Sequence, residues 1–393
     1  MKEVVIVGGA RTAIGDYMGS LSSLNAVQLG IIALKGAIAK AGIDKSLIQE
    51  VIAGHVNQAG APGNSARHIA LGAELPVESF AFTVHQQCPS SMRASEMLSQ
   101  EIMLGKIDIG AVVGVESMSN APYLLFGARK GYRLNDGEKI QDSLMIGGLV
   151  DVSLGYHMGV TAENIADQYQ ISRREQDEWA LMSHQRACAA IEKGWFKDEI
   201  IPVEVKTRKG PVMFERDEHP RADTSMESLG KLKPVFKKDG TVTAGNASGL
   251  NDAGSSMIMM AAEKAKELRL KPIARVVASA PGSVEARIMG MGVVPAIHNA
   301  LKFAKMKLED MDYFELNEAF AAQVIGCNRE LKVPLDKVNA VGSGISMGHP
   351  VGATGARLII TMMNELKRRG KKFGCAALCG SGGTGHAFII EML

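Results

Sequence analysis

The chain has 393 residues, with 44 Lys and Arg against 42 Asp and Glu, a net charge of +2 and 46% hydrophobic residues. A chain this apolar is not disordered, its length favours two packed units, and its near-neutral charge argues against nucleic acid or an anionic membrane as the main partner. Its 5 Cys are too few for a disulfide framework, and the odd count leaves at least one thiol free.

The first residues predict a buried strand rather than a targeting segment. Residues 2–9 read KEVVIVGG, and no basic region, apolar segment and small-residue cleavage site precede them. No apolar run reaches the roughly 18 residues of a membrane span. We therefore expect a soluble cytoplasmic protein with no membrane partner.

Short apolar runs then alternate with longer segments of helical period. The predicted strands are 4–7, 51–56, 111–115, 273–278, 313–316, 374–379 and 386–391. The predicted helices include 25–41, 91–104, 172–193, 295–305 and 352–369. This alternation is typical of an α/β fold with mostly parallel, covered sheets.

The pattern also repeats once along the chain. Four pairs of features recur at offsets of about 260–270 residues: Val4 and Ile273, Asn57 and Asn317, Cys88 and His349, and the runs 111–115 and 374–379. These offsets predict two copies of one α/β unit. The stretch between them, about 119–250, contains long polar sections and is expected to be an insertion with ligand-binding loops.

Cys88 is a candidate nucleophile. It precedes Pro89 and a segment of helical period, and Pro favours the first position of a helix. Cys88 is therefore predicted at the N-cap, where the helix dipole and free backbone N–H groups would lower the pKa of its thiol. A buried, inert cysteine is the alternative.

Three more residues occupy positions that suit chemistry. His349 lies in a Gly-rich loop before a helix, where a tight turn is the alternative and no P-loop pattern is present. Cys379 ends a strand before a glycine loop. With Cys375 it forms a C-x-x-x-C pattern, but a zinc site would need a second pair of Cys or His at a suitable spacing, and none follows. Asn317 follows a strand and could orient a water or a carbonyl, although an N-cap role is the alternative.

Taken together, these residue types suggest acyl transfer by a cysteine. That reaction needs a thiolate, a base to generate it, a second acid or base, and donors for an oxyanion. Spacing alone does not show that the residues converge. Cys188 and Cys327 lie among apolar neighbours and are expected to pack in the core.

Longer patterns spread over nearly the whole chain add a resemblance. They are GARTAIG at 9–15, CPSSMRA at 88–94, GVESMS at 114–119, GYHMGVTAEN at 155–164, GTVTAGNASGLNDAG at 240–254, NEAFAAQ at 317–323, GISMGHPVGATGAR at 344–357 and CGSGGTG at 379–385. Together they resemble the thiolase family, of the acetyl-CoA acetyltransferase type. The resemblance implies a thiolase fold with two βαβαβαββ halves in an α-β-α-β-α arrangement. The halves would be 1–118 with 250–271, and 272–393, around a loop domain 119–249 that binds coenzyme A.

The resemblance also implies catalytic roles. Cys88 would take the acyl group as a thioester, with His349 as its base. Cys379 would remove a proton from the methyl group of acetyl-CoA or return one. Asn317 would hold a water that forms one oxyanion hole with His349, and the backbone N–H groups of Cys88 and Ser381 would form the other.

Further positions match residues near coenzyme A in the family. They are His157, Met158, Arg221, Ser228, Ser248 and Met289. The polar section 120–145 matches a tetramerisation loop, in which Arg129, Lys130 and Arg133 would reach the 3′-phosphate or be simply solvated. The resemblance therefore implies acyl-CoA substrates, a homotetramer with a dimer as the alternative, and neither a permanently bound cofactor nor a metal.

Departures from the family pattern surround the reactive residues. Residues 85–91 read HQQCPSS where Asn-x-x-Cys-Gly-Ser-Gly is usual, and the last loop has Gly380 and Ser381 where CIGGG is usual. The histidine loop, usually GGAIALGHPIGASG, is altered at Ser343, Ser346, Met347 and Thr354. These changes put the preferred acyl chain in doubt.

The expected reaction is reversible condensation of acyl-CoA with acetyl-CoA, or of two acetyl-CoA, to a 3-oxoacyl-CoA and CoA. A 3-oxoacyl synthase and an acyl-CoA-binding protein with weakened catalysis are the alternatives. The first differs by its usual Cys-His-His or Cys-His-Asn site, and the second is motivated by Pro89 and Ser91. Close approach of Cys88 and Cys379 would also permit a reversible regulatory disulfide.

Overall fold

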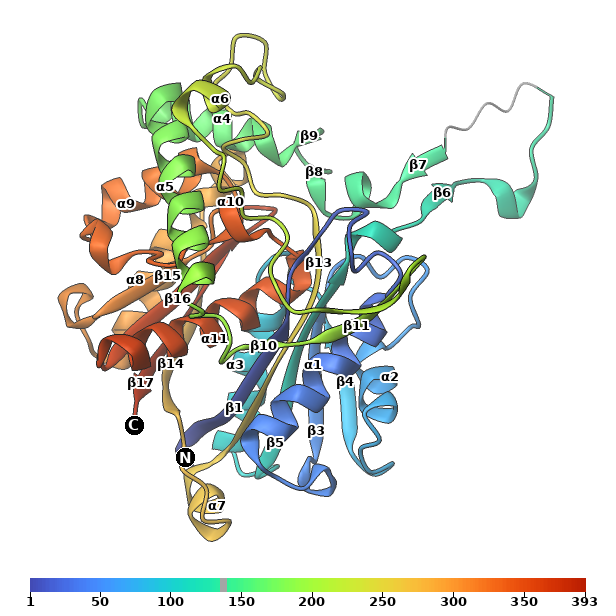
Figure 1. Ribbon diagram of the computed structural model, residues 1–393, viewed down its shortest axis with the longest axis vertical. Coiled ribbons are helices and arrows are strands. Elements are labelled where there is room, and N and C mark those ends of the chain that lie inside the picture. Colours follow the sequence, from blue (N-terminus) through green and yellow to red (C-terminus); the bar gives the residue numbers. More distant parts are fainter. Residues whose placement is uncertain (135–139) are drawn as a thin grey trace.

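The computed structural model describes residues 1–134 and 140–393 (Figure 1). Part of the predicted section 120–145 therefore lies outside the described residues. The main strands are β1 (Val4–Thr12), β3 (Glu50–His55), β4 (Phe80–Val84), β5 (Ile109–Ser117), β13 (Asn251–Ala261), β14 (Ala274–Ser283), β15 (Tyr313–Leu316), β16 (Phe373–Gly380) and β17 (Thr384–Met392). The short strands are β2 (Gly15–Asp16), β6 (Tyr123–Leu125), β7 (Ile140–Asp142), β8 (Val150–Asp151), β9 (Tyr156–His157), β10 (Ile200–Ile201), β11 (Val203–Thr207) and β12 (Gly210–Phe214).

The α-helices of the described residues are α1 (Ala26–Ala41), α2 (Ser65–Gly72), α3 (Ser90–Met103), α4 (Met158–Gln168), α5 (Arg173–Glu192), α6 (Met226–Gly230), α7 (Ala262–Glu267), α8 (Val293–Ala304), α9 (Ala321–Leu331), α10 (Gly344–Met347) and α11 (Val351–Arg369). Five of the α-helices, α1, α3, α5, α8 and α11, match the five predicted helical segments closely. Asn25 and Ser172 close capping boxes at the starts of α1 and α5, which explains why both helices begin where polar residues precede an apolar period.

The order of the strands shows the duplication. The sheet runs β15–β16–β17–β14–β1–β13–β5–β3–β4. From the middle outward, the first half runs β1, β13, β5, β3 and β4, and the second half runs β14, β17, β16 and β15. In both halves the first strand is followed by the last strand and then by the inner strands. In the second half an isolated bridge from Phe314 to Val338 takes the place of β4. The two halves join through a short antiparallel pairing of β1 with β14, at Val5 and Ile6.

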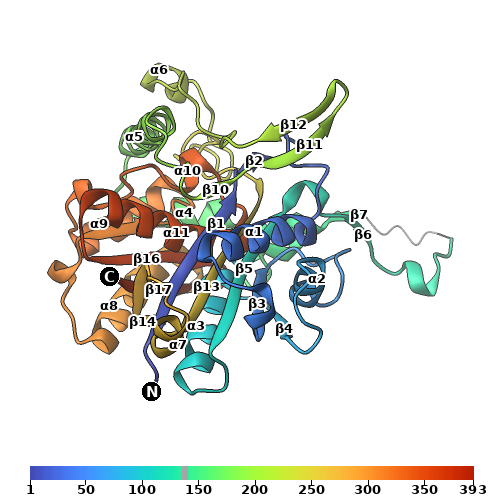
Figure 2. The same cartoon turned by 60° about the horizontal axis from the view of Figure 1, so that its bottom comes forward.

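Five layers result from this arrangement (Figures 1 and 2). Helices α1 and α2 pack on the outer face of the first half, and α8 packs on the outer face of the second, against β14 and β17. Helices α3 and α11 contact each other and the strands of both halves, so they form the buried middle layer. The predicted duplication in α-β-α-β-α layers is present.

The prediction of mostly parallel sheets is wrong. Every pairing from β16 through β5 along the strand order is antiparallel. The flanking pairs β15–β16, β5–β3 and β3–β4 are parallel, as is the short pairing of β10 with β1. The longest strand, β13, was not among the predicted strands. Its sequence NDAGSSMIMMA starts with polar and small residues, yet all of it is buried between β1 and β5, so local hydrophobicity understates its role.

The segment between the halves forms an arm and a helical cap. Strands β6 and β7 pair and project away from the body in Figure 1, whereas α4 and α5 cover the second half and α6 packs on α5. None of the helices in residues 1–134 and 140–393 combines the length and hydrophobicity needed to cross a membrane.

Candidate active site

The starts of the two central helices bring Cys88 and His349 to the same region. Cys88 precedes α3 and His349 precedes α11. The N-terminal parts of these helices touch, because the Oγ of Ser91 accepts a hydrogen bond of 3.0 Å from the N–H of Ala356. A Cβ at Gly355 would lie 2.5 Å from the backbone nitrogen of Met92, so the close approach depends on this glycine.

A tight turn presents Cys88. Gln87 has a left-handed φ of 54°, and the N–H and hydroxyl of Ser90 both donate to its carbonyl, at 3.0 and 2.6 Å. The N-cap of α3 is Pro89, not Cys88 as predicted, because the carbonyl of Pro89 accepts the first helical hydrogen bond, from Arg93. The thiol therefore stands one residue outside the helix.

The predicted low pKa of Cys88 is also wrong. Burial raises the pKa of this thiol well above its ordinary value, and the neighbouring Cys379 raises it further. Cys88 packs against an apolar cluster that includes Val56, Met118 and Val351. Desolvation disfavours the thiolate more than a helix terminus favours it, so the resting thiol is neutral.

His349 is held as a neutral base. Its Nδ1 lies 2.7 Å from the Oγ1 of Thr354, whose hydroxyl donates to the carbonyl of Pro350 at 2.9 Å. Since that hydroxyl has one hydrogen, it accepts from Nδ1–H, and the lone pair is left on Nε2. Burial, together with the charge of Arg357, lowers the pKa of His349 to about 3.

Asn317 completes one side of this site. Its Nδ2 lies 3.4 Å from the Nε2 of His349, and its side chain is fully buried at the end of β15. Its Oδ1 has no hydrogen-bond partner among the described residues. A buried amide that faces an imidazole and has an unused oxygen is suited to hold a polar atom of a substrate or a water.

Glu318 is a residue that the sequence did not single out. Its buried carboxylate accepts from the Nε1 of Trp179 at 3.0 Å, the Oγ of Ser183 at 2.6 Å, the Nδ2 of Asn339 at 3.0 Å and the N–H of Ile345 at 3.3 Å. These donors come from α5, from the loop at Asn339 and from α10, which precedes His349. Glu318, which follows Asn317 directly in the chain, is therefore held by hydrogen bonds to other parts of the fold.

Cys379 approaches from the end of β16. It is fully buried opposite Gly385, and burial raises the pKa of its thiol to about 12. A Cβ at Gly380, the residue after Cys379, would lie 2.9 Å from the Cδ of Pro89, the residue after Cys88, so the chain at Cys379 runs beside the chain at Cys88. Ser381 lies two residues further on, in the turn before β17. Its backbone N–H has no hydrogen-bond acceptor among the described residues.

The residues matched to coenzyme A fall into two groups. His157 caps α4 and stacks on Phe236, with ring centroids 4.5 Å apart, and Phe236 meets Phe320 edge-on. Met158 and Met289 are buried in the apolar core of the same half. This first group therefore lies on the side of the second half, close to the chain that follows Asn317.

The second group lines a separate cavity of about 350 Å³. Arg221 and Ser228 contribute to it, together with His184 and His219. The hydroxyl of Ser228 donates to the carbonyl of Ser225 at 2.9 Å, so it also serves the cap of α6. Ser248 does not line this cavity, and its N–H donates to the carbonyl of Ala319 at 3.0 Å.

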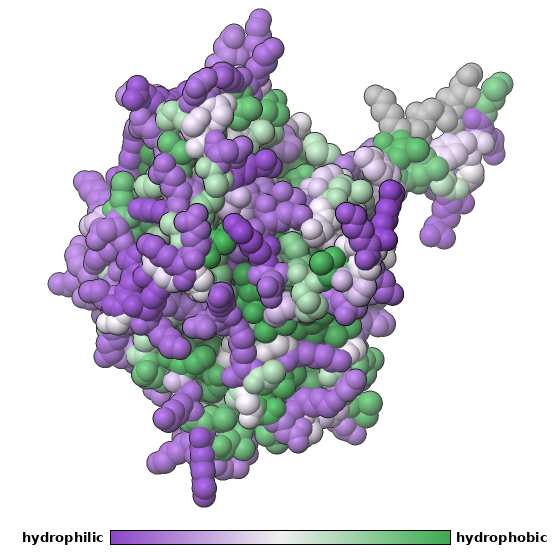
Figure 3. Space-filling model, viewed as in Figure 1, coloured by the Kyte–Doolittle hydropathy of each residue, from purple (hydrophilic) through white to green (hydrophobic). Residues whose placement is uncertain are grey.

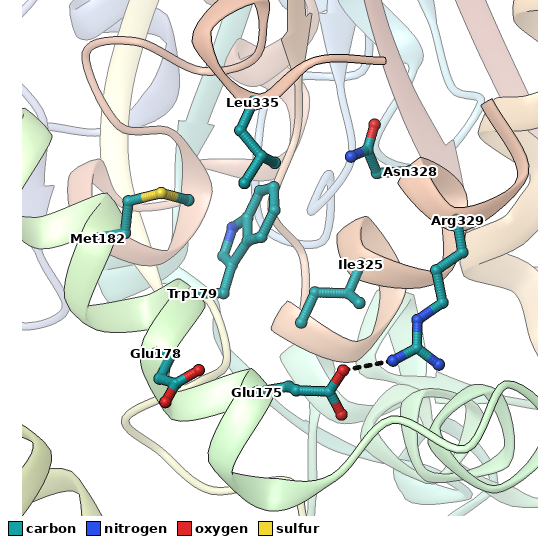
Figure 4. A pocket seen from close by; sticks show the side chains of 8 residues that line it. All are labelled: Glu175, Glu178, Trp179, Met182, Ile325, Asn328, Arg329 and Leu335. Carbon is teal, nitrogen blue, oxygen red and sulfur yellow. Dashed lines mark hydrogen bonds and ion pairs between the residues drawn. The ribbon is translucent and has the colours of Figure 1, made fainter. Parts of the chain in front are cut away.

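Another cavity, of about 340 Å³, lies between α5 and α9 (Figure 4). Apolar side chains including Trp179 and Ile325 form its walls, and an ion pair of Glu175 with Arg329 lies at one side. It contains none of the predicted catalytic residues. Its link to the site is indirect, through the hydrogen bond from Trp179 to Glu318.

Comparison with known proteins agrees with this geometry. Residues 4–263 match the family model "Thiolase, N-terminal domain", and residues 270–392 match "Thiolase, C-terminal domain". The acetyl-CoA acetyltransferases of Syntrophomonas wolfei and Escherichia coli are 48% and 46% identical to the chain, each over 100% of both sequences.

Solved structures give the same result. The structure of the Syntrophomonas wolfei acetyl-CoA acetyltransferase matches with a TM-score of 0.98 at 48% identity, over 100% of both chains. Human mitochondrial 3-ketoacyl-CoA thiolase in complex with CoA matches with a TM-score of 0.96 at 39% identity, over 100% of this chain and 98% of that one. The fold expected from the sequence motifs is therefore confirmed, and the chain belongs to the thiolase family.

Proposed function

We propose that the chain is a CoA-dependent thiolase that converts acyl-CoA and acetyl-CoA reversibly into a 3-oxoacyl-CoA and CoA, two acetyl-CoA giving acetoacetyl-CoA. The observation that carries the proposal is the neutral His349, whose Nε2 faces Asn317 at 3.4 Å in the region where two neighbouring thiols meet. The curated relatives named acetyl-CoA acetyltransferase support the same reaction.

The first half-reaction is acyl transfer. The Sγ of Cys88 attacks the thioester carbonyl of acyl-CoA while the Nε2 of His349 takes its proton. The backbone N–H groups of Cys88 and Ser381 stabilise the oxyanion. The bond from the acyl carbon to the CoA sulfur then breaks, and that sulfur takes a proton from Cys379. Acyl-Cys88, a protonated His349 and a Cys379 thiolate remain.

The second half-reaction forms the carbon–carbon bond. The Cys379 thiolate removes a proton from the methyl group of acetyl-CoA, and its high pKa of about 12 makes it a strong base for this step. His349 and a water on Asn317 stabilise the enolate oxygen. The enolate carbon attacks acyl-Cys88, and the departing Cys88 sulfur recovers its proton from His349. Cys88, His349 and Cys379 thereby return to their starting protonation states.

Binding and assembly form a second part of the proposal. Residues 119–249 would act as the loop domain that holds coenzyme A, between a first half of 1–118 with 250–271 and a second half of 272–393. The arm carries several exposed large side chains, Tyr123, Leu125, Phe126, Leu134 and Ile140. Green areas are visible on the arm in Figure 3. Exposed apolar patches of this kind support assembly into the predicted homotetramer. A cytoplasmic location remains a prediction of the sequence.

Incubation with acetyl-CoA tests the proposed activity. We expect intact-mass spectrometry to show one acetyl group per chain, peptide mapping to place it on Cys88, and added acetoacetyl-CoA to be cleaved in the presence of CoA. The Cys375→Ala variant removes a thiol from β16 without touching the site and should still be acetylated. Tight binding of CoA with neither acetylation nor turnover would contradict the proposal and favour a binding protein.

The rate of acetylation should depend little on pH between about 5 and 8. The pKa of His349 is lowered to about 3 and that of Cys88 is raised, so both groups are neutral throughout this range. Base function is lost only as the pH falls towards 3 and His349 gains a proton. Rapid-quench measurement of acetyl-Cys88 formation checks this. An acid limb with a midpoint near 6.5, the ordinary value for histidine, would contradict it.

A further inference from the structure

Asp151 connects the segment between the two halves to the turn that follows Cys379. Its Oδ2 accepts a hydrogen bond of 3.1 Å from the N–H of Gly382 and lies 3.4 Å from the Oγ of Ser381. Asp151 is only 5% exposed, although it stands in a region of short strands and loops. Burying a carboxylate costs free energy, so a buried carboxylate that contacts this turn from 230 residues away in the sequence calls for an explanation.

The other carboxylate oxygen of Asp151 is bound as well. Its Oδ1 accepts from the N–H and hydroxyl of Ser153 and from the N–H of Leu154. Burial opposes ionisation, but these hydrogen bonds and the one from Gly382 outweigh it and lower the pKa of Asp151. The side chain is therefore a charged acceptor fixed at both oxygens.

The turn that Asp151 contacts has a demanding conformation. Gly382 and Gly383 have left-handed φ values of 82° and 84°. On one side, the carbonyl of Gly383 accepts from the N–H of Val284 at 2.8 Å. On the other side, Asp151 occupies the N–H of Gly382, whereas the N–H of Ser381 has no acceptor among the described residues and is available to a substrate.

We propose that Asp151 is a positioning residue for acyl transfer. It holds the turn 381–383 so that the N–H of Ser381 meets the oxyanion that forms at Cys88. The inference rests on the proposed function, because it assigns the support for an oxyanion hole of that reaction. Such donors act only when they are fixed in advance at the place where charge develops.

Asp151 also lies close to a residue matched to coenzyme A. Strand β8, which ends at Asp151, pairs with β9, so that Asp151 lies opposite Tyr156 and Val150 opposite His157. His157 is one of the residues matched to coenzyme A. The strand next to the one that carries Asp151 therefore holds a residue matched to coenzyme A.

Asp151→Asn and Asp151→Ala test the proposal. We expect both to slow the single-turnover acetylation of Cys88 and to lower kcat for thiolysis, by about 10–100-fold for Ala and less for Asn, because a misplaced donor stabilises the oxyanion poorly. The KM for acyl-CoA should stay within about threefold, since the change acts on the transition state. Asp151→Asn keeps the shape of the side chain, so it should keep the melting temperature close to that of the wild type.

Asp312→Asn is the matched control. The carboxylate of Asp312 also accepts two backbone N–H groups, from Lys372 and Phe373, at 3.0 and 2.9 Å. It does so at the opposite end of β16, away from Cys379, so this variant should keep the wild-type acetylation rate. Wild-type acetylation in both Asp151 variants, or a raised KM with unchanged kcat, would overturn the inference while leaving the thiolase proposal intact. An unacetylated wild-type protein would instead overturn the proposed function and this inference with it.

Discussion

His349→Ala is expected to slow the acetylation of Cys88 by about 10³-fold, because general-base catalysis contributes factors of this order. The resting thiol is neutral, since burial raises its pKa, and a neutral thiol is a poor nucleophile. The Nε2 of His349 is the base that the geometry provides, with its tautomer fixed by Thr354. Loss of this base leaves Cys88 protonated at the moment of attack.

Rapid-quench mass spectrometry measures the acetylation rate directly, in the first turnover. His298→Ala serves as the matched control, because His298 is an exposed residue of α8 on the outer face of the second half. It should acetylate at the wild-type rate. Acetylation of His349→Ala within about tenfold of wild type would mean that another group takes the proton, and the assigned role of His349 would fall.

The places of the candidate site residues at the ends of strands and helices were predictable, but their surroundings were not. Strand ends and Gly-rich loops marked Cys88, Asn317, His349 and Cys379, and the repeat predicted the two halves that bring them together. The pKa of Cys88 was predicted in the wrong direction because a helix terminus is visible in sequence, whereas desolvation depends on what surrounds the thiol.

Supporting contacts over long sequence distances lay beyond sequence reasoning. Asp151 reaches Ser381 across 230 positions, and Ser183 reaches Glu318 across 135. Neither pairing leaves a periodic pattern, because each depends on how the intervening segment folds back over the second half. The antiparallel core of the sheet was missed for the same reason, since β13 joins β1 and β5 from far along the chain.

Pro89 and Gly380 lie against each other beside the two thiols. The family pattern has Gly at the first position and Ile at the second, and both differ in this chain. A Cβ at position 380 would lie 2.9 Å from the Cδ of Pro89 and 2.8 Å from the Oγ1 of Thr384. The proline ring therefore fills space that a side chain at 380 would need, and each change is compatible with the other.

Gly380→Ile is expected to destabilise the protein by about 1–3 kcal/mol, the usual cost of overpacking a core, and to abolish most thiolysis because it displaces Cys379. Adding Pro89→Gly removes the ring, so the double variant should regain much of both losses. Melting temperatures and kcat of the two single variants and the double variant give the coupling free energy. Gly63→Ile is the control, because a Cβ at Gly63 meets nothing within 4 Å. Strictly additive effects of the two substitutions would give a coupling free energy of zero. Pro89 and Gly380 would then be independent, which would contradict this prediction.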